Sequence, residues 1–162
     1  MRMNIDIGKA ALLAILILAA EPGSVLADSC GDRVSALQAS IKGLALKQRA
    51  RVTSDFDAFY LENQNPSTGI TVSCGPKVLS FDAEWSGGSL ATYGKLLKQV
   101  SGSLSLDSDD FLSALKTCWS EAELSNDDED ETGPVVVPTS RGQISCVDKQ
   151  GKAEINVSGP SR

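Results

Sequence analysis

Hydrophobic and polar residues follow their most regular pattern between Gly69 and Gly102, where they predict a hairpin and a helix. Ile70, Val72 and Cys74 alternate with polar residues, which is the period of a strand with one buried face. Gly75-Pro76 interrupts this strand and predicts a tight turn into a second, antiparallel strand. The apolar side chains of the second strand share one face: Leu79, Phe81, Ala83 and Trp85.

A helix is predicted directly after this hairpin. Ser89 is suited to be its N-cap, and the apolar residues after it recur every three or four positions. These residues are Leu90, Tyr93, Leu97 and Val100. Because a helix with an apolar stripe must pack against another apolar surface, we expect it to cover the apolar face of the hairpin.

An earlier helix is predicted from Asp32, but its end is ambiguous. Its stripe consists of Val34, Leu37, Ile41 and Leu44. The helix could continue, since Val52, Phe56 and Phe59 extend the same stripe. It could also stop, because 53–55 is a possible new cap and 56–61 fits a strand equally well. The sequence leaves both alternatives open.

A third helix is predicted after Gly102. Asp107 or Ser108 could cap it, and Asp109 and Asp110 would then lie in its first turn, where the helix dipole favours acidic residues. Its inward stripe is expected to contain Phe111 or Leu112, Leu115, Trp119 and Ala122.

The C-terminal part predicts strands. Pro134 and Pro138 bracket 135–137, which suits a short edge strand or an extended linker. The alternating runs 143–147 and 153–158 flank a glycine-bearing turn and predict a second hairpin. The expected fold class is α+β: a small single domain over residues 28–162, with an N-terminal helix, a β-hairpin, two helices, a C-terminal β-hairpin and two disulfides.

The N-terminal 27 residues have the organisation of a secretory signal peptide. Basic Arg2 and Lys9 precede an uninterrupted apolar run of 11 residues at 10–20. A bilayer-spanning helix needs about 20 apolar residues, so we expect cleavage after Ala27 and no transmembrane anchor afterwards. Lipidation of Cys30 is the alternative, although acidic Asp28 stands where a small apolar residue is usual. The expected location is the bacterial periplasm or the exterior.

Four cysteines predict two disulfides formed in an oxidising compartment. They are Cys30, Cys74, Cys118 and Cys146, and no Cys-x-x-Cys motif occurs among them. Three pairings are possible. We favour Cys30 with Cys74 and Cys118 with Cys146, since each pair joins a helix to a strand in the same half of the chain.

The net charge of −6 comes mainly from one acidic segment. Seven acidic residues and no basic residue lie within 121–131, and we expect a solvated acidic loop at 121–133. The segment lacks the register of a calcium-binding EF-hand loop, so no metal site is expected. The negative charge and the few aromatic residues argue against nucleic acid as a partner.

The chain contains no histidine, which removes histidine-based nucleophilic catalysis and most transition-metal sites. Asp82 and Glu84, on the outward face of their strand, are the best carboxylate pair for acid–base chemistry. Lys47, Arg49 and Arg51 form a basic cluster that could contact a partner. Their ordinary interpretation is the solvated face of the first helix.

These features favour an exported bacterial protein without catalytic activity: a binding, adaptor or structural protein of the cell envelope or exterior. No cofactor is expected, and the partner would be a protein or an envelope component. Two alternatives stay open: a carboxylate-dependent enzyme using Asp82 and Glu84, and a cation or envelope binder using the acidic loop.

Overall fold

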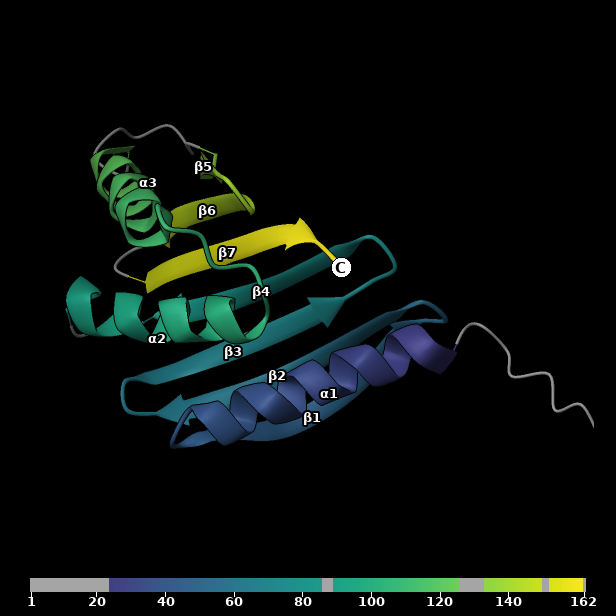
Figure 1. The fold of residues 1–162 in the computed structure, drawn as a ribbon. Coiled ribbons are helices and arrows are strands. Elements are labelled where there is room, and N and C mark those ends of the chain that lie inside the picture. The colour runs from purple at the N-terminus through teal and green to yellow at the C-terminus, as the bar shows by residue number, and fades with distance from the viewer. Residues whose placement is uncertain (1–23, 86–88, 126–132, 150–151, 162) are drawn as a thin grey trace, which may run out of the picture.

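The computed structural model describes residues 24–85, 89–125, 133–149 and 152–161, which form three helices and one seven-stranded antiparallel sheet (Figure 1). In chain order the elements are α1 (Ser24–Ser40), β1 (Leu44–Thr53), β2 (Phe56–Gln64), β3 (Ser67–Cys74), β4 (Val78–Trp85), α2 (Leu90–Ser103), α3 (Phe111–Ser125), β5 (Val135–Thr139), β6 (Gly142–Lys149) and β7 (Lys152–Pro160). The α+β class is therefore confirmed.

The strands are ordered β1-β2-β3-β4-β7-β6-β5 across the sheet. The predicted hairpins β3–β4 and β6–β7 are both present. The expected layout of two separate hairpins is wrong, because β4 pairs with β7 and places Phe81 opposite Val157. Two additional strands, β1 and β2, extend one side of this sheet, and β5 forms the other edge.

The end of the first helix differs most from the sequence-based expectation. Helix α1 stops at Ser40, and Gly43 then adopts a φ of 92°, in the left-handed region that glycine tolerates best. The chain turns there into β1, so Leu44 starts a strand and does not extend the helical stripe. The open question about 56–61 is settled in favour of a strand, since these residues belong to β2.

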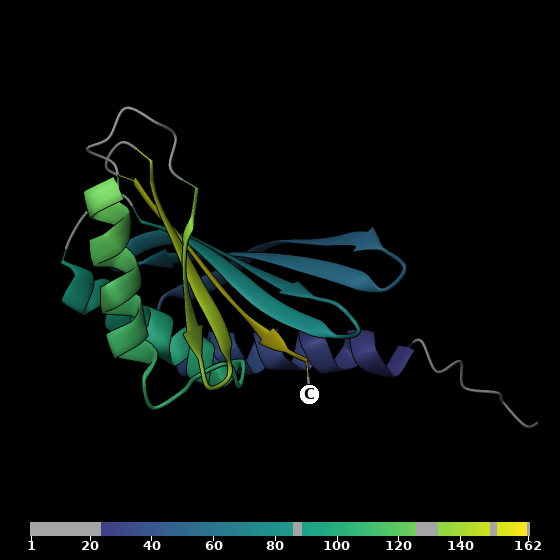
Figure 2. The same cartoon turned by 90° about the horizontal axis from the view of Figure 1, so that it is seen from above.

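The three helices lie on one face of the sheet (Figures 1 and 2). The inward side chains of the central strands are almost completely buried beneath them, as the alternation predicted: Ile70, Val72, Leu79, Phe81 and Ala83. Helix α2 lies between α1 and α3 and contacts both. Its predicted cap is confirmed, because the Ser89 hydroxyl accepts a hydrogen bond from the Thr92 amide at 3.3 Å. Within the described ranges, no helix covers the opposite face.

Two disulfides tie helices to the sheet. Cys30 of α1 is bonded to Cys74 of β3, and Cys118 of α3 is bonded to Cys146 of β6, with Cα–Cα distances of 6.2 and 5.7 Å. The expected pairing is thus confirmed, and Cys30 is used in a disulfide. Such a disulfide framework is typical of proteins that fold outside the reducing cytoplasm.

Two predicted segments lie partly outside the described residues. Residues 1–23 of the predicted signal peptide are not among them, and the expected cleavage site after Ala27 falls in the first turns of α1. The first part of the predicted acidic loop is helical, because Glu121 and Glu123 lie on α3. Its centre at 126–132 is outside the described residues. No helix in the described ranges is long and apolar enough to cross a membrane.

An aromatic cluster closes the core near the end of β4. The Trp85 ring stacks on Tyr93 with 5.1 Å between ring centroids and contacts Trp119 edge-on at 5.6 Å. The Tyr93 hydroxyl lies 3.3 Å from the hydroxyl of buried Thr68. Desolvation by burial raises the pKa of Tyr93 to about 12. The neutral phenol is therefore the form that the fold stabilises.

We expect alkaline pH to destabilise the protein through Tyr93. In the unfolded chain this phenol ionises near pH 10, whereas in the fold its pKa is raised to about 12. The phenol makes its full contribution to the free energy of unfolding below pH 10. This contribution, about 2 to 3 kcal/mol in total, is lost as the pH rises towards 12. Urea unfolding of wild type and Tyr93→Phe between pH 8 and 12 measures this loss. Parallel pH profiles for the two proteins would contradict the assignment.

Candidate functional site: a polar pocket

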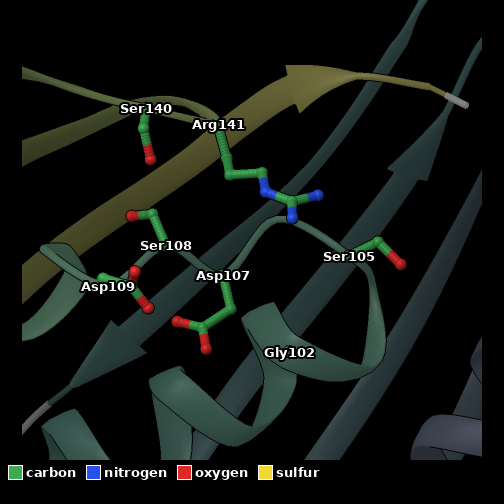
Figure 3. A pocket seen from close by; sticks show the side chains of 7 residues that line it. All are labelled: Gly102, Ser105, Asp107, Ser108, Asp109, Ser140 and Arg141. Carbon is green, nitrogen blue, oxygen red and sulfur yellow. The ribbon is translucent and has the colours of Figure 1, made fainter.

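A polar pocket of about 480 Å³ lies between the α2–α3 connection and the β5–β6 turn (Figure 3). Its volume is within the range of small-molecule sites, roughly 300 to 1,000 Å³. Every residue that lines it is polar or glycine: Gly102, Ser105, Asp107, Ser108, Asp109, Ser140 and Arg141. We call this site the polar pocket.

The C-terminus of α2 forms one wall of the polar pocket. The Leu106 amide donates to the Ser101 carbonyl at 2.8 Å, and the Ser105 amide donates to the Gly102 carbonyl at 3.0 Å. This is the hydrogen-bond pattern of a Schellman motif, in which the residue after the cap is left-handed. Ser105 fills that position with a φ of 61°, although a side chain there costs about 1 to 2 kcal/mol. The turn ends the helix and leads the chain along the pocket to Asp107.

Asp107 and Ser108 contribute buried polar atoms without partners. Ser108 is only 7% exposed, yet its hydroxyl has no hydrogen-bond partner among the described residues. The same is true of the buried Oδ1 atom of Asp107. The predicted capping role of these side chains is wrong, because α3 starts at Phe111 and Asp109 and Asp110 precede it. Both atoms are thus buried without a partner, in residues that line the polar pocket.

Arg141 contributes the positive charge of the polar pocket. It lies in the turn between β5 and β6, directly before Gly142, whose φ of 152° is unfavourable for other residues. Its side chain is exposed and forms no ion pair with any residue in the described ranges. Figure 3 shows the guanidinium group on one side of the α2–α3 connection and the carboxylates of Asp107 and Asp109 on the other. The opposite charges of the pocket do not form an ion pair with each other.

The predicted basic cluster lies on edge strand β1, so its expected position on the helix is wrong. A β-bulge between Leu46 and Gln48 turns Lys47 towards Glu62, with 2.9 Å between Nζ and Oε2. This hydrogen bond lowers the pKa of Glu62. Arg49 and Arg51, which are two positions apart on β1, face the other way and approach the Asp57 carboxylate at 3.1 and 3.7 Å.

Asp57 explains why the basic cluster does not form one surface. Its carboxylate is almost completely buried, and it lies on the opposite face of β2 from Glu62. Lys47 is therefore separated from the two arginines by the sheet. That these three residues contact a partner stays a prediction, which would now involve a sheet edge.

Asp82 and Glu84 lie on the uncovered face of β4, as expected. They line a hollow of about 280 Å³ together with Glu154 and Asn156 of β7. The Asn156 amide donates to Asp82 Oδ1 at 2.7 Å, and both carboxylates are exposed. No group of three potential metal ligands occurs among the described residues.

No known protein family matches the chain, and no curated protein or solved structure is significantly similar to it. The chemistry of the site is therefore the only basis for a function.

The sequence did not identify the polar pocket. Ser140 and Arg141 lie more than 30 positions after Asp107, and no motif connects the two segments. One local signal was present: Arg141 is followed by glycine in a turn between two alternating runs, a place where exposed functional residues are common.

Proposed function

We propose that the protein is an exported bacterial binding protein without catalytic activity, and that it holds a small polar ligand in the polar pocket. Export is supported by the signal-peptide pattern and the two disulfides. Binding is supported by a concave site whose lining offers both charges and several hydroxyl groups.

The unpartnered Ser108 hydroxyl carries this proposal. A buried polar group without a hydrogen bond costs about 1 to 3 kcal/mol, and folded proteins satisfy nearly all such groups. The described residues contain five such atoms, and two of them, Ser108 Oγ and Asp107 Oδ1, belong to residues that line the polar pocket. A ligand that supplies partners to these atoms recovers their desolvation cost on binding.

Binding can be tested by NMR titration of the isotope-labelled, disulfide-bonded protein. The panel contains neutral sugars, inorganic anions, polyamines and amino acids. We expect at least one class to shift the backbone amides of Ser105, Ser108 and Arg141. Ser108→Ala should weaken that binding about tenfold, in line with the value of a hydrogen bond to a charged or buried group. If no compound shifts these amides, the polar pocket is not a ligand site.

A carboxylate-dependent enzyme is the alternative proposal. It is supported by the hollow that Asp82 and Glu84 share with Glu154. The polar pocket has the stronger support, since the Asp82 carboxylate already accepts a hydrogen bond and both candidate side chains are exposed. The same titration separates the two proposals, because a substrate bound in that hollow would shift the amides of Asp82 and Glu84.

A further inference from the structure

We infer that the ligand of the polar pocket is a small zwitterion with the ammonium and carboxylate groups of an amino acid or a short peptide. This inference rests on the proposed function and adds the chemical class of the ligand. It comes from the arrangement of charge in the polar pocket and from the unpartnered atoms in its wall.

The carboxylate of the ligand would bind at Arg141. A guanidinium group presents five N–H donors and no acceptor, and it matches a carboxylate with two parallel hydrogen bonds. Arg141 is exposed to the pocket and has no ion pair among the described residues. It therefore offers the pocket an uncompensated positive charge.

The ammonium group would bind at Asp107. An ionised carboxylate only accepts hydrogen bonds, so the buried Asp107 Oδ1 requires a donor. Asp109 lies on the same side of the α2–α3 connection and adds a second negative charge (Figure 3). Ser108, which lies between these two residues in the sequence, also lines the pocket, and its hydroxyl can donate or accept a hydrogen bond.

Ions of a single charge fit the polar pocket less well. An inorganic anion at Arg141 would lie in the field of two carboxylates, and a simple cation at Asp107 would lie in that of Arg141. Arg141 does not form an ion pair with either acid, so each charged group can still pair with a charged group of a ligand. Only a ligand with both charges satisfies both sides, which is how electrostatic complementarity provides specificity.

Glycine, diglycine and triglycine test this inference, each also as its N-acetyl and C-terminal amide derivative. Acetylation removes the ammonium charge, and amidation removes the carboxylate charge. NMR titration then reports the affinity at the amides of Ser105, Ser108 and Arg141. We expect one free zwitterion to bind, and each derivative of it to bind about tenfold more weakly or less. The best length shows whether a free amino acid or a peptide is the better match.

Two variants assign the charges to their partners. In Arg141→Gln, amidation should cause no further loss, because the partner of the carboxylate is already absent. In Asp107→Asn, acetylation should likewise cause no further loss. Lys42→Gln and Asp55→Asn make the same charge changes on exposed residues in the other half of the chain and should bind like wild type. Dispersed spectra show that each variant is folded.

The outcomes separate the two proposals. Binding of sulfate or a neutral sugar at the pocket amides, with no response to any zwitterion, overturns the ligand class and leaves the proposed function in place. Equal binding of zwitterions and their blocked derivatives also overturns the ligand class. No response to any probe overturns both, since water alone would then satisfy Ser108 and Asp107.

Discussion

Gly142→Ala should lower the free energy of unfolding by about 3 kcal/mol or more and should abolish ligand binding in the polar pocket. A Cβ atom at this position would overlap the carbonyl oxygen of Ser158 and lie 2.8 Å from the Cα of Gly159. Its φ of 152° adds backbone strain for any residue with a side chain. Because Gly142 follows Arg141, relief of the overlap would move the guanidinium group out of place.

Gly69→Ala is the matched control for this experiment. Gly69 also lies in a strand, but a Cβ atom there would meet nothing within 4 Å. The control should be neutral or slightly stabilised, since alanine reduces the entropy of the unfolded chain. Urea unfolding monitored by tryptophan fluorescence compares the two variants. Similar stabilities would show that β6 can shift away from β7 without cost.

Loss of the Cys118–Cys146 disulfide should lower the free energy of unfolding by about 3 to 4 kcal/mol. The bond closes a loop with a sequence separation of 28, and its removal gives the unfolded chain more conformational freedom. Both cysteines are completely buried, so a mild reductant should reach this bond only after unfolding. The bond of half-buried Cys74 should be reduced first.

Two measurements check the role of this disulfide. Urea unfolding of Cys118→Ala/Cys146→Ala gives the loss of stability, and mass spectrometry after brief reduction and alkylation gives the order in which the bonds open. Wild type reduced in full should lose at least as much stability as this double variant, because reduction also opens the Cys30–Cys74 bond. If reduction leaves stability unchanged, the loss in the double variant comes from packing and not from the cross-link.

The sequence predicted the elements that contribute most to the core. In β3 and β4, nearly every second residue is buried, and in α2 buried residues recur every three or four positions. The periodicity of these elements is therefore strong. The disulfide pairing followed from the same elements, since each bond joins a predicted helix to a predicted strand. Burial of one regular face is a local property, and local properties are readable from one sequence.

The elements that the sequence did not predict lack such a pattern. Strand β1 buries only Leu44 and changes register twice, between Leu46 and Gln48 and again after Arg51. An edge strand has one neighbour and needs no continuous apolar face. The pairing of β4 with β7 joins residues such as Phe81 and Val157, which are more than 70 positions apart. No local rule connects residues at that separation.

The polar pocket was missed for a related reason. The sequence marked Asp107 and Ser108 as helix caps, because these residue types are common at that position. In the structure the Schellman turn at Ser105 directs the chain so that α3 starts only at Phe111. The failure of the capping rule becomes visible only when the turn is known. The pocket becomes visible only when Arg141 is also placed beside this turn.

The two edges of the sheet differ from its interior in a way that affects behaviour at high concentration. An unpaired strand edge can recruit a strand from another molecule and start aggregation. Here β1 carries a bulge and three basic residues, and β5 is five residues long and includes Pro138, which has no N–H to donate. Both features oppose edge-to-edge pairing. We therefore expect that molecules in a crowded compartment do not associate through their sheet edges.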